Sequence, residues 1–322
     1  MIMSNIHNTL YKFSGAGNDF VVIDGRKGDV DEFRTVERIG ELCKEFKTDG
    51  LMILGGARSV PGMTEGVDFT MEFYNPDGTG GMMCGNGGRC ITAFADMLGL
   101  KPAAEDGTWH FLAPDGPHEA KILDRSFVAT APQDDKCVWT VRLKMIDVSG
   151  ITPMMGGYFL NTGTRHFVKF VDDVDSIDME QEAKPLRWDP AFQPVGTNVN
   201  FVERRPDGLH IRTYEKGVEG ETLACGTGIT ASAIASIMEI PGTSPRMTME
   251  SQRMTEKVKL QCRRGDWLTV EFDQNGQYFT NVYLTGPAEV VAVLKNGPKT
   301  RMTRSKTGSH PQKQAKNEDD YK

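Results

Sequence analysis

The sequence lacks the features that mark membrane and secreted proteins. No apolar run approaches the roughly 20 residues of a membrane-spanning helix, and the N-terminal stretch MIMSNIHNTLYKF shows no basic segment followed by an apolar core. An excess of positive charge is also absent, because the formal net charge is −7. General binding to nucleic acid or to membrane surfaces therefore has no electrostatic support. We expect a cytoplasmic protein that binds neither a membrane nor nucleic acid.

The sequence also lacks the cysteine patterns of metal and redox sites. Its six cysteines are irregularly spaced, and no C-x-x-C pair occurs. Cys84 and Cys90, in the segment MMCGNGGRC, are separated by five residues, and no second pair matches them. The same segment fits neither a dinucleotide-binding glycine fingerprint nor a phosphate-binding loop with its lysine. We expect reduced thiols, no metal and no cofactor.

Length and apolar pattern predict a two-domain α+β protein. The 322 residues, 39% of them hydrophobic, suffice for two domains of ordinary size. Short apolar runs bounded by turn residues predict strands, among them 19–25, 67–75, 139–146, 196–203, 209–215 and 266–273. Apolar residues at helical spacing predict helices over 31–47, 90–100 and 228–239. The last two are apolar on all sides, which is typical of buried helices. Residues 297–322 carry a net charge of +4 and almost no apolar side chains, which predicts a disordered basic tail.

Two segments repeat along the chain. MMCGNGGRCITAFADMLG and LACGTGITASAIASIME both place Cys-Gly-polar-Gly before an apolar helix, and their cysteines, Cys84 and Cys225, lie 141 residues apart. Upstream, GAGNDFVVID (15–24) is similar to GTRHFVKFVD (163–172), in the same order. Two matches in register indicate two similar, pseudo-symmetric domains rather than chance likeness of glycine-rich turns.

A cysteine at the start of a helix is suited to chemistry. The first N–H groups of a helix have no internal partner, and the helix dipole is positive there, so a thiolate is stabilised and the thiol pKa should fall below its usual value of about 8.5. Gly85 and Gly87 leave the backbone open to a ligand carboxylate. Two such thiols, Cys84 and Cys225, at a domain interface fit a two-base racemase or epimerase, which removes a proton from one face of a carbon and returns it to the other.

The motifs GAGNDFVVID, FYNPDG, MCGNGGRC, GTNVNFVE and YEKG…ETLACGTG, in this order, resemble the diaminopimelate epimerase family over roughly residues 10–296. The resemblance implies interconversion of LL- and meso-diaminopimelate without pyridoxal or another cofactor, in lysine and peptidoglycan precursor biosynthesis. It also implies two domains, each a mostly antiparallel β-barrel around a central helix, with the active site at their interface. We place the domains at residues 1–143 and 144–283, with the last strand, 284–296, returning to the first.

The resemblance also implies roles for individual residues. Cys84 and Cys225 would be the catalytic base and acid. The substrate-binding positions would be Asn18, Asn75, Gly85, Asn86, Asn198, Glu215, Lys216, Gly226 and Thr227, with supporting roles for His166, Thr164 and Arg165. Taken alone, the asparagines could cap turns and His166 could be a structural histidine.

The chain departs from the usual family pattern at three places, all on the side that would bind the remote end of the substrate. Gly50 stands where a glutamine is common, Thr164-Arg165 where Asn-Pro is common, and Lys216 where the family has an arginine. A lysine can pair with a carboxylate but not through a bidentate fork. Arg165 is an additional cation that could supply part of this recognition.

Other functions stay open on the sequence alone. A racemase or epimerase of another, proline-type amino acid is one alternative, and a non-catalytic amino-acid-binding protein is another. A thiol redox protein, in which Cys84 and Cys225 form a disulfide, is a third. The retained asparagines argue against the first, and the two retained cysteines argue against the second. The partner we expect is a small amino-acid substrate, and a homodimer is one open possibility for the assembly.

Overall fold

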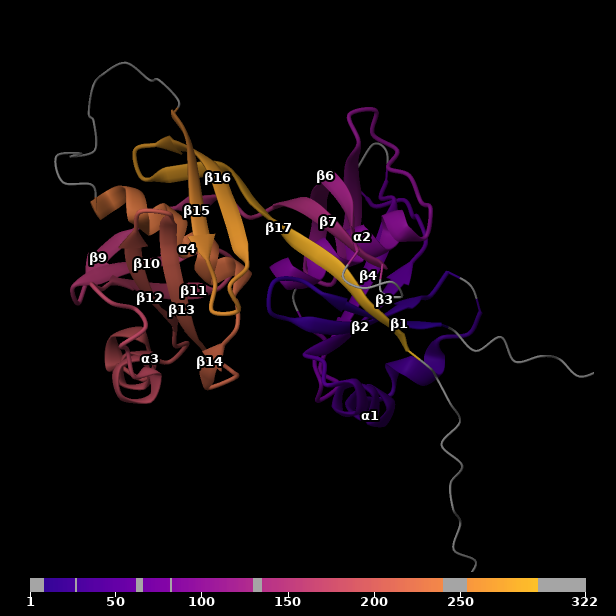
Figure 1. Ribbon diagram of the computed structural model, residues 1–322, viewed down its shortest axis with the longest axis horizontal. Helices are drawn as coiled ribbons and strands as arrows, with labels where there is room; N and C mark the ends of the chain where they lie inside the picture. Colours follow the sequence, from indigo (N-terminus) through magenta and orange to yellow (C-terminus); the bar gives the residue numbers. More distant parts are fainter. Residues whose placement is uncertain are drawn as a thin grey trace, which may run out of the picture.

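The computed structural model describes residues 9–26, 28–61, 66–81, 83–129, 135–239 and 254–294. Two lobes lie side by side, and the long strand β17 (Tyr278–Leu294) runs from one into the other (Figure 1). The predicted tail, 297–322, and the last two residues of the predicted final strand lie outside these ranges. None of the helices within these ranges combines the length and the apolar character that a membrane crossing requires.

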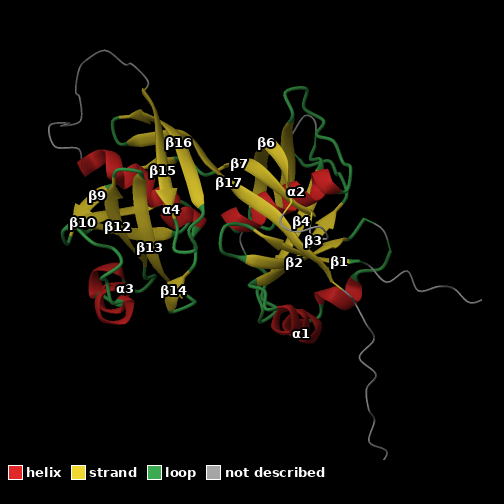
Figure 2. Ribbon diagram, viewed as in Figure 1, coloured by secondary structure: helices red, strands yellow, loops and turns green. Residues whose placement is uncertain are grey.

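Eight strands close into a ring in the first lobe, which we call the N-lobe. Each strand from β1 to β7 pairs with the next, β7 pairs with the end of β17, and β17 pairs with β1. The strands are β1 (Leu10–Ser14), β2 (Asp19–Asp24), β3 (Gly50–Gly55), β4 (Phe69–Tyr74), β5 (Thr108–Ala113), β6 (Gly116–Ala129) and β7 (Asp135–Lys144). Helix α2 (Gly85–Met97) lies inside the ring (Figure 2), where residues 85 to 95 are all buried. A helix that is apolar on almost every side can lie only in such a place.

Short helices cover the outside of the N-lobe. The 3-10 turn η1 (Asp31–Arg34) leads into α1 (Val36–Phe46), whose first free N–H groups are capped by the Thr35 hydroxyl. The apolar stripe of α1, Ile39, Leu42 and Cys43, packs on the outer side of β2 and β3.

The second lobe, the C-lobe, repeats this plan. Its strands are β8 (Val148–Ser149), β9 (Thr152–Met154), β10 (Gly157–Asn161), β11 (Arg165–Phe170), β12 (Asn198–Arg205), β13 (Gly208–Glu215), β14 (Gly220–Thr222), β15 (Met254–Gln261) and β16 (Trp267–Asn275). They surround α4 (Gly226–Ser236), which ends in the 3-10 turn η4 (Ile237–Glu239). The outer layer consists of η2 (Met179–Ala183), α3 (Lys184–Arg187) and η3 (Pro190–Phe192).

The strand pairings of the two lobes match one by one. β2–β3 and β4–β5 are parallel, and so are their counterparts β11–β12 and β13–β15. The pairs β3–β4 and β5–β6 are antiparallel, and so are β12–β13 and β15–β16. The predicted α+β class, with a mostly antiparallel barrel around a central helix in each of two pseudo-symmetric halves, is confirmed. The border at residues 143 and 144 stays our proposal.

β17 belongs to both lobes. Its first residues pair with β16, up to Thr285 opposite Thr269, and from Gly286 onward it pairs with β7 and then with β1. The strand therefore begins earlier than the predicted 284–296. Because one continuous strand is hydrogen-bonded in both barrels, it holds the lobes together at their interface.

Candidate active site

The starts of the two central helices face each other between the lobes. Cys84 and Cys225 are the residues immediately before α2 and α4, and both have extended backbones (φ −82°, ψ 130° and φ −128°, ψ 111°). A methyl group built on Gly226 would lie 3.6 Å from the Cα atom of Gly85 and 3.1 Å from Leu284 Cδ2. Glycine at both positions therefore lets the helix starts approach, and the predicted cysteines come together at the lobe interface.

Backbone and side-chain donors surround both sulfur atoms. The N–H groups of Asn86 and Gly87 point at the sulfur of Cys84. The sulfur of Cys225 has the N–H group of Gly228 and the hydroxyl of Thr227, which lies at 3.4 Å. These are the free donors of the first helical turn that the sequence predicts at such a position.

The expectation that the helix starts lower the pKa of the thiols is wrong. Burial raises the pKa of Cys84 and of Cys225, because a thiolate loses more hydration than these donors replace. The negative charge of Glu215 raises the pKa of both thiols further. Cys84 is half-buried and Cys225 is 8% exposed. A thiolate formed here is consequently a stronger base than a cysteine in water.

A chain of side chains orders the N-lobe half of the site. Arg89 Nη2 donates to Asn86 Oδ1 (2.8 Å), and Asn86 Nδ2 donates to Asn18 Oδ1 (2.7 Å). These bonds fix both amide orientations and leave the Asn18 amino group available as a donor to a carboxylate. Asn75 Nδ2 donates to Thr79 Oγ1 (3.0 Å), which leaves the Asn75 carbonyl oxygen as an acceptor.

His166 lies at the centre of the C-lobe half and is fully buried. Burial lowers the pKa of His166 to about 3, so the ring is neutral at physiological pH. Its Nδ1 accepts from Asn200 Nδ2 (3.0 Å), which places the ring proton on Nε2. Nε2 is 2.9 Å from the hydroxyl of Thr164 and 2.9 Å from that of Thr227. Through Thr227, the histidine is connected to Cys225.

Asn198 and Lys216 bind mainly to other protein groups. Asn198 Oδ1 accepts from the Lys216 N–H (2.7 Å), and its amino group donates to Thr164 Oγ1 (3.2 Å) and to the Arg165 carbonyl (3.1 Å). Lys216 Nζ donates to the carbonyl of Val195 (3.0 Å). Both residues therefore position the rim of the C-lobe, and their substrate contacts stay predictions.

Glu215 is half-buried at the end of β13, next to this rim. Burial raises the pKa of Glu215, and the negative charge of Asp49 from the N-lobe raises it further. A nearby cation stabilises a desolvated carboxylate more than it stabilises a carboxylate in water. Glu215 is therefore suited to contact a substrate ammonium group. Its role in binding stays a prediction.

Two of the sequence departures have a structural setting. A side chain on Gly50 would place its Cβ 2.8 Å from the carbonyl oxygen of Tyr74 and 3.0 Å from the Phe73 ring, so the close pairing of β3 and β4 requires glycine. Arg165 is exposed and precedes the buried His166 on β11. Successive side chains of a strand point to opposite faces, which directs Arg165 away from His166.

Two residues of the site were missed from the sequence. Arg89 is the cation of the mostly apolar helix α2 and is fully buried, and Asn200 orients His166 from the neighbouring strand. A cation inside an all-apolar helical pattern is a signal that sequence reasoning could have used for Arg89. Asn200 lies in GTNVNF, but only the fold shows that it shares a face with His166.

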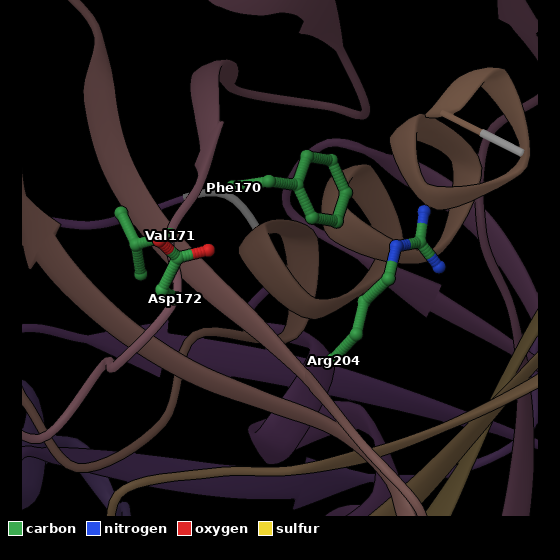
Figure 3. A pocket seen from close by; sticks show the side chains of 4 residues that line it. All are labelled: Phe170, Val171, Asp172 and Arg204. Atoms are coloured by element: carbon green, nitrogen blue, oxygen red, sulfur yellow. The ribbon is translucent and has the colours of Figure 1, made fainter. Parts of the chain in front are cut away.

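A separate cavity of about 390 Å³ lies elsewhere in the C-lobe, lined by Phe170, Val171, Asp172 and Arg204 (Figure 3). The Arg204 guanidinium lies 4.8 Å from the centre of the Phe170 ring and donates to the carbonyl of Ser236, the last residue of α4. At 1.5 Å rise per residue, the end of this 11-residue helix is about 16 Å from its start. The cavity is thus remote from Cys225.

Comparison with solved structures defines the class of protein. The chain shares its fold with a phenazine biosynthesis protein of the PhzF family from Bacillus anthracis (TM-score 0.61, 11% identity, 89% of this chain and 97% of that one). It also shares it with a probable proline racemase from Agrobacterium radiobacter K84 (TM-score 0.54, 13% identity, 92% and 95%). At these identities the likeness shows the fold alone. Fold and site together define a two-barrel protein with a pair of cysteines between its lobes.

Sequence comparison gives the family. The family model described as diaminopimelate epimerase matches residues 158–291. The chain is 37% identical over 286 residues to diaminopimelate epimerase of Flavobacterium psychrophilum, covering 88% of this chain and 97% of the relative. It is 35% identical over 287 residues to that of Chlorobaculum tepidum, covering 86% and 97%. The chain belongs to the diaminopimelate epimerase family and is an isomerase.

Proposed function

We propose that this protein epimerises LL-diaminopimelate to meso-diaminopimelate, without a cofactor, in lysine and peptidoglycan precursor biosynthesis. The observation that carries the proposal is the approach of Gly85 and Gly226, which sets a cysteine at the start of each of two facing helices. The family membership supplies the substrate. We further propose a cytoplasmic location and leave a homodimer open.

In the proposed reaction, the α-carbon of the substrate loses one proton and receives another on its opposite face. One cysteine, as thiolate, takes the α-proton and becomes a thiol, and the electron pair of the C–H bond stays on the substrate. The other cysteine, as thiol, gives its proton to the opposite face of that carbon and becomes a thiolate. Charge and protons balance, and the two sulfur atoms have exchanged states. Cys84 and Cys225 suit these roles because they reach the interface from different lobes.

Helix starts and burial would stabilise the carbanion. The backbone N–H groups in the first turns of α2 and α4 that do not point at a sulfur atom are fixed donors for the substrate carboxylate, onto which the negative charge of the carbanion spreads. Asn18 and Asn86 add a donor of fixed orientation beside them. The raised pKa of both thiols favours proton abstraction, because a more basic thiolate better matches the weakly acidic α-carbon.

Deuterium exchange tests the proposal. Reduced protein is incubated with LL-diaminopimelate in deuterated water without added cofactor, and α-deuterium uptake and formation of the meso form are followed. We expect both in wild type and neither in a Cys84→Ala, Cys225→Ala double variant. Cys43→Ala, which removes a buried cysteine under α1, is the matched control and should retain both. No exchange by wild type contradicts the function, and exchange by the double variant contradicts the two-thiol mechanism. Proline in place of diaminopimelate tests the alternative substrate class.

A further inference from the structure

Arg89 is a fully buried cation whose hydrogen-bond partners are all neutral. Its guanidinium donates to the carbonyls of Gly15 (3.2 Å), Gly85 (3.3 Å) and Pro287 (3.4 Å), and to Asn86 Oδ1 (2.8 Å). Among the described residues, no carboxylate lies within ion-pair distance of it, whereas the buried Arg187 and Arg212 pair with Glu219 and Glu221. Burying a charge without a counter-charge is costly, so proteins rarely keep one without a use.

Two of the groups that Arg89 binds, the Gly85 carbonyl and Asn86 Oδ1, belong to the two residues that follow Cys84. Cys84 lies five residues before Arg89. Burial is the largest influence on the pKa of this thiol and raises it, and the charge of Arg89 acts in the opposite direction. Cys90 is also close, but it lies fully buried inside α2, whereas Cys84 is half-buried at the start of the helix. The two backbone N–H groups at Cys84, from Asn86 and Gly87, add to the stabilisation of an anion there.

Among the described residues of the C-lobe, no cation takes the corresponding place in α4. Counting from the two cysteines, the position of Arg89 in α2 is taken by Thr230 in α4, whose hydroxyl donates to the carbonyl of Gly226 (3.0 Å). His166, linked to Cys225 through Thr227, is neutral. Glu215 places a negative charge near both thiols, and a thiolate at Cys84 raises the pKa of Cys225 further. The pseudo-symmetry of the lobes is therefore broken by one charge.

We propose that Arg89 sets the resting protonation of the active site, with Cys84 as the thiolate and Cys225 as the thiol. Arg89 is a positioning residue, because it acts through Cys84 and through Asn86, whose amide it orients. The proposal rests on the proposed function only in taking these two cysteines as the acid and the base. The two sulfur atoms hold one proton between them, and the charge of Arg89 favours its position on Cys225 before substrate binds.

Alkylation without substrate tests the assignment. Reduced full-length protein is treated with iodoacetamide over a pH series, and mass spectrometry measures the rate at each cysteine. Only the thiolate reacts, so the pH at which each rate rises reports ionisation separately from accessibility. In wild type, we expect the rate at Cys84 to rise at lower pH than that at Cys225. Arg89→Met should move the Cys84 profile up by about one pH unit or more, and Arg89→Lys should move it less.

Thr230→Val, at the same position of the other helix, is the matched control and should leave the Cys84 profile unchanged. Earlier ionisation of Cys225 in wild type overturns the proposal, and so does an unchanged Cys84 profile in folded Arg89→Met. If Arg89→Met does not fold, the proposal is tested by the order in which Cys84 and Cys225 ionise in wild type and by the Cys84 profile of Arg89→Lys. Because no substrate is present, a failure of diaminopimelate turnover leaves this result standing, and a reversed ionisation order leaves the proposed function standing.

Discussion

Gly85 and Gly226 meet across the lobe interface so closely that a methyl group on Gly226 would lie 3.6 Å from the Cα of Gly85. Each glycine is the first residue of a helix and follows a cysteine. The distance between the two sulfur atoms is therefore set by the backbone of two helices and by β17, which is hydrogen-bonded in both barrels. Such rigid positioning is what proton transfer at one carbon from two sides requires.

Gly226→Ala should reduce catalysis more than stability. The new methyl would lie 3.1 Å from Leu284 Cδ2, so this side chain must shift, and it would fill the space between the two helix starts, 3.6 Å from the Cα of Gly85. Because misplacement by about 1 Å can cost about 100-fold in rate, we expect a loss of ten- to 100-fold in kcat/KM for diaminopimelate. Gly56→Ala, where an added methyl meets no atom within 4 Å, is the control and should change neither quantity. A Gly226→Ala enzyme with wild-type kcat/KM would show that the close approach has no role.

Gly50→Ala should destabilise the N-lobe. The added carbon would lie 2.8 Å from the Tyr74 carbonyl oxygen, so β3 and β4 must separate locally. We expect a loss of about 1–3 kcal/mol in the free energy of unfolding, as for other overpacked sites, measured by urea denaturation. Unchanged stability would mean that the glycine here has no packing reason, and that a glutamine at this position would be tolerated.

His166 should make stability depend on pH between 6.5 and about 3. The unfolded chain binds a proton at this histidine below its usual pKa of about 6.5, whereas the folded protein does not until about pH 3. Stability from this group is therefore complete above pH 6.5 and falls as the pH falls. We expect wild type to lose about 1 kcal/mol more than His166→Gln between pH 7 and pH 5.5 in urea unfolding. Equal slopes for the two proteins would refute the assignment.

Lys216→Met should weaken substrate binding at the rim while sparing the chemistry. Lys216 lies on the exposed turn after β13, held by Asn198 and by the carbonyl of Val195. We expect KM for diaminopimelate to rise several-fold with kcat changed by less than about threefold, because a contact made equally in ground and transition states alters KM alone. Because Arg165 points away from His166 on β11, we expect Arg165→Ala, which removes the other cation of this region, to raise KM less than Lys216→Met does. A higher KM in Arg165→Ala than in Lys216→Met would show that Arg165, and not Lys216, binds the remote end of the substrate.

The sequence allowed prediction of the elements whose pattern is local. The β2 strand, α1 and the cysteines at the two helix entries follow from apolar periodicity and from the repeated Cys-Gly-polar-Gly segment. The start of α2 was placed too late, at residue 90 instead of Gly85, because three glycines in six residues disfavour a helix locally and only packing inside the barrel offsets this. The full length of β17 could not be predicted either, because its pairings join residues that are far apart in the chain.

The electrostatics of the site could not be predicted from the sequence. The helix start at Cys84 indicated a lowered pKa, but burial raises it, and the next residue, Gly85, lies against Gly226 and Leu284 of other elements. The neutral state of His166 comes from its burial inside the C-lobe, and its orientation comes from Asn200, which the pairing of β11 with β12 places on the same face. Arg89 donates to the carbonyls of Gly15 in the turn after β1, of Gly85 in α2 and of Pro287 in β17. These are properties of tertiary contacts, which the order of residues encodes only through the fold.

The most direct test of the central claim, that two thiols act on opposite faces of one carbon, is the position of label early in the reaction. Wild-type enzyme converts LL-diaminopimelate in deuterated water, and the α-deuterium content of the meso product and of the remaining LL substrate is measured before a tenth of the substrate has reacted. If Cys84 and Cys225 act separately, the product gains its α-hydrogen from a solvent-equilibrated thiol. The account therefore predicts deuterium in nearly all of the meso product and almost none in the remaining LL substrate. A product that retains the substrate's own protium, or substrate labelled as fast as product, would contradict it and indicate a single base.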